Sequence, residues 1–121
     1  MALFAPVRSE KTDLDAVRRY AASVIARSEG EDLQMKAVTL ALLGGIMWRG
    51  APGSTEMIQD EVGSKAILSA TLGSRHLTFT YDQNTESIEM REGTTDGPVL
   101  HRFCNRTLIN DVEETFSALW R

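Results

Sequence analysis

Cysteine is almost absent from this sequence. Its single cysteine, Cys104, can form no intrachain disulfide. Proteins of reducing compartments rarely depend on disulfides. The opening residues, MALFAPVRSEK, also lack a charged segment followed by a long apolar stretch, so they do not resemble a secretory signal. Both features predict a cytoplasmic location.

The sequence also lacks a long hydrophobic run and an excess of positive charge. Its longest apolar run, VTLALLGGIMW at residues 38–48, is much shorter than the roughly 20 residues that a membrane-spanning helix needs. The formal net charge is −4, and the basic residues are scattered. Because phosphate binding requires clustered Lys and Arg, we expect neither nucleic acid nor a membrane surface as a partner.

Metal and catalytic motifs are missing as well. No C-x-x-C, H-E-x-x-H, G-x-S-x-G or phosphate-loop pattern occurs. The two histidines, His76 and His101, are predicted on opposite faces of a sheet, so they would not share a metal ion. We therefore expect no cofactor and no metal site, and catalysis is the less favoured class of function.

What remains is the composition of an ordinary globular protein. The chain has 121 residues, of which 42% are hydrophobic and 25% charged. A chain of this length buries enough surface to form a core without metal or disulfide. We expect one compact domain over residues 1–121.

Two helices are predicted in the first half of the chain. TDLDAVRRYAASVIARSEG has helical periodicity, with Thr12 as its capping residue. Its expected buried stripe is Leu14, Val17, Ala21, Val24, Ile25 and Ser28. The second helix covers residues 31–49, and the short connection predicts a helical hairpin.

The second helix is apolar on two sides. One stripe contains Leu33, Ala37, Leu40, Ala41 and Trp48, and the other contains Met35, Val38, Leu42 and Ile46. A helix that is apolar all round is usually surrounded by protein. We expect a core helix packed on both flanks, or else a subunit interface that covers one flank. Gly44 and Gly45 leave two alternatives, a continuous helix or one that stops near Leu43.

The periodicity then changes from helix to strand. A short third helix is slightly favoured for TEMIQDEVG, after which AILSATL, HLTFTYD, SIEMR and VLHRFC alternate as strands. A two-residue turn at Gln83-Asn84 would place Phe79 opposite Ile88 and Leu77 opposite Met90. We expect an antiparallel meander of three to four strands, with one polar face.

The C-terminal segment TLINDVEETFSALWR predicts an amphipathic helix packed on the sheet. Its apolar stripe is Leu108, Ile109, Val112, Phe116 and Leu119. The fold class is therefore α+β, with an N-terminal helical hairpin, an antiparallel sheet and a C-terminal helix.

The best candidates for a ligand site are side chains that converge at one end of the predicted sheet. His101 lies between two apolar positions on the core side, and Tyr81 would face Glu86 in the register above. A phenol, a carboxylate and an imidazole at a pocket mouth suit acid–base chemistry or a polar ligand. The predicted ligand-binding residues are Tyr81, Glu86, His101, Phe103 and Trp48, although a structural role for His101 and Trp48 is the simpler interpretation.

Three classes of function follow, in decreasing order of support. The first is a protein-interaction or homo-oligomeric module without catalysis, because the helices carry more apolar surface than one small core can cover. The second is a small-molecule binding domain with an apolar pocket between helices and sheet. The third is a small acid–base enzyme that uses Tyr81, Glu86 and His101. α+β architecture alone selects none of them.

Overall fold

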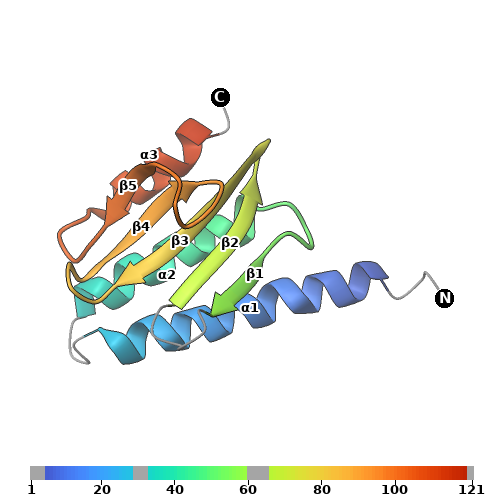
Figure 1. The fold of residues 1–121 in the computed structure, drawn as a ribbon, viewed down its shortest axis with the longest axis horizontal. Coiled ribbons are helices and arrows are strands. Elements are labelled where there is room, and N and C mark those ends of the chain that lie inside the picture. The colour runs from blue at the N-terminus through green and yellow to red at the C-terminus, as the bar shows by residue number, and fades with distance from the viewer. Residues whose placement is uncertain (1–4, 29–32, 60–65, 120–121) are drawn as a thin grey trace.

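The computed structural model describes residues 5–28, 33–59 and 66–119. Two helices precede five strands, and a third helix follows them (Figure 1). In chain order the elements are α1 Ala5–Arg27, α2 Leu33–Arg49, β1 Glu56–Gln59, β2 Ala66–Leu72, β3 Arg75–Asp82, β4 Ser87–Glu92, β5 Val99–Phe103 and α3 Ile109–Leu119. The α+β class is confirmed.

The five strands form one antiparallel meander in the order β1-β2-β3-β4-β5. All three helices lie on one face of the sheet, and none of them covers the opposite face (Figure 1). α2 turns back from the end of α1 and passes behind the middle of the sheet, and α3 lies at the β5 end. The hairpin of α1 and α2 therefore forms, but its two helices splay apart beneath the sheet.

The prediction of a short third helix was wrong, because β1 occupies residues 56–59. Met57 pairs with Leu68 of β2, and this pairing adds a fifth strand to the expected three or four. A four-residue strand at a sheet edge has too few residues to show a clear period of two, so its pattern resembled a helix start. Residues 60–63 of the predicted helix lie outside the described part.

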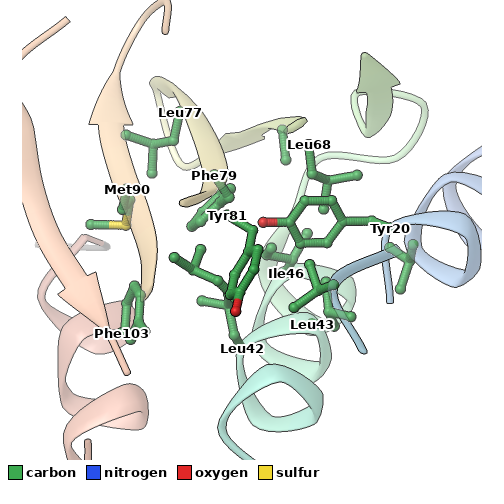
Figure 2. Close-up of a cluster of buried hydrophobic side chains, with 14 of the residues drawn as sticks. Tyr20, Leu42, Leu43, Ile46, Leu68, Leu77, Phe79, Tyr81, Met90 and Phe103 are labelled. Carbon is green, nitrogen blue, oxygen red and sulfur yellow. The ribbon is translucent and has the colours of Figure 1, made fainter. Parts of the chain in front are cut away.

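Alternation along the strands places the core on the helix side of the sheet. One cross-strand row joins Leu68, Phe79 and Met90, and the next joins Tyr81, Ile88 and Phe103. These side chains are buried against the inner flank of α2, where Leu42 and Ile46 meet them (Figure 2). Burial of apolar side chains between two layers is the main stabilising term of such a fold.

The register between β3 and β4 differs from the predicted one by two residues. Phe79 faces Met90, and Tyr81 faces Ile88, because residues 83–86 form a four-residue turn. Glu86, and not Asn84, adopts the positive φ that closes this turn, at 53°. A shift of two residues keeps every side chain on its own face, so the apolar match alone did not distinguish the two registers.

α1 begins seven residues before the predicted cap at Thr12, which lies inside the helix. Its buried positions include Ala16, Val17, Tyr20 and Val24, whereas Leu14 is half-exposed. The stripe is therefore rotated towards Tyr20, a residue that the sequence pattern missed.

Asp13 explains part of this rotation. Its buried carboxylate accepts hydrogen bonds from the backbone N–H of Gly53, at 2.6 Å, and of Thr55, at 2.9 Å. Both donors belong to the turn that joins α2 to β1. The carboxylate thus satisfies backbone groups that would otherwise be buried without partners, and it fixes α1 against that turn.

α3 packs mainly along α2, and its Phe116 side chain reaches the sheet. The Phe116 ring stacks on Phe79, with ring centroids 6.4 Å apart. It also lies against Gly45, where an added Cβ would be 2.9 Å from the Phe116 Cδ2. α3 was expected to pack on the sheet. It contacts the sheet through Phe116, but its main packing partner is α2.

Candidate functional site

The structure does not bring the five predicted ligand-binding residues together. Tyr81 and Phe103 are buried in the core (Figure 2), and Glu86 is exposed in the turn between β3 and β4. Trp48 lies at the exposed end of α2, and His101 is half-buried on the edge strand β5. Their role in ligand binding stays a prediction, but the expected convergence of Tyr81, Glu86 and His101 is not observed.

His101 lies on the core side of β5, as its position between apolar neighbours predicted. Its ring contacts Phe103 at a centroid distance of 4.6 Å and an angle of 54°. It also lines a shallow groove of about 490 Å³ beside α3, together with Arg102, Thr107, Asp111, Glu114 and Thr115. Several side chains of this groove can form hydrogen bonds, and its lining is about equally polar and apolar.

A different region combines exposure with apolar character. We call it the outer apolar face, and it consists of Leu33, Leu40 and Trp48 on α2 with Leu108 and Ile109 at the start of α3. The exposed fractions are 83% for Trp48, 74% for Leu33 and 60% for Leu40. Leu108 and Ile109 are also about half-exposed or more.

The α2 part of the outer apolar face, Leu33, Leu40 and Trp48, belongs to the first of the two stripes recognised on the second helix. α2 runs without interruption from Leu33 to Arg49, as one of the two alternatives predicted. The expectation of a core on both flanks was wrong, because only the stripe with Met35, Val38 and Ile46 is buried. Leu33, Leu40 and Trp48 of the other stripe are exposed, whereas Ala41 packs partly against the core.

A groove of about 400 Å³ lies between α2 and α3, and Trp48 and Ile109 of the outer apolar face line it. Its lining consists of Ala41, Gly44, Gly45, Trp48, Arg49, Ile109, Val112, Glu113 and Phe116. The groove exists because α2 presents small residues there. At Gly44 an added Cβ would have no other atom within 4 Å, so this position opens directly to solvent.

Polar contacts close both ends of the seam between α2 and α3. At one end Arg49 Nη2 lies 2.7 Å from Glu113 Oε1, which also accepts a hydrogen bond from Ser117 Oγ at 3.0 Å. At the other end Gln34 Nε2 donates to the backbone carbonyl of Thr107 at 3.4 Å. These contacts hold α3 in register with α2 and pair the opposite charges at the groove mouth.

The helix-free face of the sheet is polar, and its central charged side chains are paired with one another. Glu89 is almost buried there, and its two carboxylate oxygens each contact one arginine, Arg91 and Arg102, at 3.0 Å. Arg91 also donates to the carbonyl of Gly97 at 2.7 Å. Because these charged groups already have partners, this face offers a weaker binding surface than the outer apolar face.

No helix in the described ranges combines the length and apolar character that crossing a membrane requires. Within the same ranges, no group of three or more His, Cys, Asp or Glu side chains is placed to hold a metal ion.

The sequence contains a signal for the outer apolar face. The two-sided apolar pattern of residues 33–48 was recognised, and interface coverage of one flank was the second interpretation. Leu108 and Ile109 were placed on the buried stripe of the last helix, because they share its helical spacing. In the structure they lie at the first turn of α3, beyond the reach of the core.

Comparison with protein-family models identifies a family that this chain matches. Residues 17–112, well over half of the chain, match the model of a family described as Integron cassette protein VCH_CASS1 chain. None of the curated proteins compared with the chain matches it. The matched range includes α2, the whole sheet and the start of α3, and therefore the whole outer apolar face.

Proposed function

The chain belongs to this family of integron cassette proteins, and from that premise we propose that it is a protein-interaction module without catalytic activity. The family description names no reaction and no ligand, so the proposal depends on the surface of this chain. The outer apolar face carries it. This face is built on regular helices, which makes it a rigid binding surface.

The composition of the outer apolar face is typical of a protein-binding site. The five side chains that define it are all apolar, and none carries a charge. Contiguous apolar surface of this kind marks interaction sites in proteins, whereas single exposed apolar residues are common and carry no such meaning. Trp48 is also the residue type most enriched at energetic centres of interfaces.

Other features of the chain agree with a role in binding rather than chemistry. The side chains considered for acid–base catalysis lie apart, with Glu86 exposed in a turn while Tyr81 is buried. The free thiol of Cys104 is half-buried, and we place the protein in the reducing environment of the cytoplasm as part of the same proposal.

The groove between α2 and α3 supports a second candidate function, small-molecule binding. Its volume of about 400 Å³ lies in the usual range for ligand pockets, and Trp48, Ile109 and Phe116 give it apolar walls. A thermal-shift screen of metabolites tests this candidate. A ligand present at about 100 times its Kd stabilises by roughly 2.7 kcal/mol, and Ile109→Glu should abolish that shift.

Site-specific photo-crosslinking tests the interaction module. A benzophenone amino acid replaces Leu40 on the outer apolar face, and in a matched control it replaces Arg19, which is exposed on α1. After irradiation in the cells that produce the protein, position 40 should give discrete protein adducts that mass spectrometry identifies, and position 19 should give none. Absence of adducts at position 40 would contradict the proposal.

A further inference from the structure

We infer that the outer apolar face binds the same face of a second copy of this chain, with the two α2 helices crossing antiparallel at Gly44. The inference depends on the proposed function, and it names the partner. In this arrangement Trp48 of each protomer enters the groove between α2 and α3 of the other. Area, shape and charge each support it.

The exposed apolar area is close to what a dimer of this size needs. From their exposed fractions, the five side chains of the outer apolar face present on the order of 600 Å² to solvent. The largest apolar patch of a typical monomer reaches about 300–600 Å², and the summed area of these five side chains is of the same size. A standard interface takes about 800 Å² from each partner, and the surrounding polar atoms supply the remainder.

The shape of the face is self-complementary. An interface with two-fold symmetry uses one patch twice, so each patch must carry both a protruding group and a depression that receives it. Trp48 protrudes from α2, and the groove of about 400 Å³ lies directly beside it. A depression of this volume accommodates an indole ring, whose burial contributes strongly to association.

The glycine in the groove fixes where the two helices meet. Helix axes approach most closely where side chains are small, and Gly44 is open to solvent with nothing near its Cβ position. An antiparallel crossing at Gly44 brings Trp48 opposite the partner's Leu40, because positions equally far from the crossing point face each other. Both residues are thereby removed from water in one contact.

Local charge does not oppose the pairing. Arg49 and Glu113 at the groove mouth neutralise each other, so two copies of the face meet without net repulsion. The antiparallel helices also align their dipoles favourably. A face with no surplus charge of one sign offers nothing to select an oppositely charged partner, which favours a second copy over an acidic or basic protein.

Sedimentation equilibrium of the full chain tests the inference. At tens of micromolar the expected mass is twice the 13.4 kDa of one chain. Leu40→Glu and Gly44→Leu should each weaken association at least tenfold, because one places a charge at the contact and the other fills the groove. Both positions are exposed, and unchanged circular dichroism would show that the variants fold. Arg19→Glu on α1 is the matched control and should leave the mass unchanged.

The fluorescence of Trp48 provides a second readout. In a Trp120→Phe background, emission should shift to shorter wavelength as concentration rises, because the indole enters the groove of the partner subunit. A single-chain mass up to about 100 µM, or a two-chain mass that neither variant changes, would overturn the inference.

Crosslinking at position 40 distinguishes two outcomes: the absence of a homodimer, and the absence of any protein partner. An adduct with a different protein and no adduct of two chains would reject the second copy and retain the interaction module. No adduct of any kind would reject both.

Discussion

The two flanks of α2 are both apolar, but they lie in opposite environments. The inner flank, with Val38, Leu42 and Ile46, is fully buried against the sheet and α1. The outer flank, with Leu40 and Trp48, is mostly in solvent. One element therefore makes two uses of the same residue types. An apolar sequence pattern predicts that a surface is buried. It does not predict whether the surface is buried within its own chain or against another chain.

The same difference shows why one apolar flank of α2 is left exposed. A three-helix, five-strand fold of this size has one core, and α2 can face it with one stripe only. A helix whose outer flank served only solvent would carry charged side chains there. The retention of leucine and tryptophan on this flank is the observation that our proposals explain.

The largest expected effect is the difference in stability between two leucine truncations, one on each flank of α2. Leu42→Ala on the inner flank should lower the free energy of unfolding by about 2–5 kcal/mol, because it leaves a cavity in a fully buried site. Leu40→Ala on the outer flank should change it by no more than about 0.5 kcal/mol. Urea unfolding of dilute protein, where the chain is monomeric, measures both.

The stability of the same two variants can also be compared with that of the wild type at high protein concentration. Leu40→Ala should then reduce the apparent stability relative to wild type, because the stability of an associating protein depends on its concentration. Equal effects of the two substitutions in dilute protein would mean that the flanks do not differ as described.

The adjacent glycines should respond to alanine with opposite signs. Gly44→Ala adds a methyl group in open space and removes the helix cost of glycine, so it should stabilise the monomer by about 0.5–1 kcal/mol. Gly45→Ala places the methyl against the buried Phe116 ring, which also packs on Phe79. Overpacking there costs about 1–3 kcal/mol and should exceed the gain in helix propensity. Thermal unfolding of both variants under one condition tests the reversal of sign.

Much of the fold was predictable from periodicity. The continuous second helix, the last helix and four of the strands follow from regular spacing of apolar residues, because core-facing positions repeat with the period of the element. The side of the sheet to which each residue of β3 and β4 points was also correct. Alternation determines the side even where the register is wrong, as at Phe79 and Met90.

The features that could not be predicted depend on contacts between distant segments. β1 is a strand because β2 lies beside it, and the start of its segment has no clear pattern of its own. Asp13 is buried because a turn about 40 residues later offers it two N–H donors. The choice of flank on α2 depends on where α1 and α3 pack. For the same reason the sequence pattern assigned Leu108 and Ile109 to the buried stripe of the last helix, whereas both are exposed in the structure.

A buried hydroxyl next to the inner flank gives a smaller effect. Tyr20 is fully buried between α1, α2 and the sheet (Figure 2), and its hydroxyl has no hydrogen-bond partner within the described structure. Tyr20→Phe should therefore raise the free energy of unfolding by up to about 1 kcal/mol, since an unpaired buried polar group is removed. Thr39→Val is the contrast, because the Thr39 hydroxyl donates to the Met35 carbonyl at 2.8 Å, and it should destabilise by a similar amount.

The same tyrosine predicts a pH dependence. Burial raises the pKa of Tyr20 far above its ordinary value near 10. Above that pH the unfolded chain loses the phenol proton while the folded chain retains it, so stability should fall as pH rises beyond about 10. Chemical denaturation at pH 9 and pH 11 should show a smaller decline for Tyr20→Phe than for wild type. An identical decline in both proteins would assign the loss to other groups.

The smallest expected effect is at the polar end of the outer flank. Glu113→Gln removes the charge that faces Arg49 and the short contact between α2 and α3. Because the Glu113 side chain is largely exposed, solvent screens the pair, and the loss should be about 0.5 kcal/mol at low salt and close to zero in 1 M NaCl. Urea unfolding at the two salt concentrations measures it. A loss of several kcal/mol that persists in high salt would mean that the pair, rather than the packing of Phe116 on Gly45, holds α3 against α2. The groove would then depend on charge, and the contrast between an apolar outer flank and a packed inner flank would need revision.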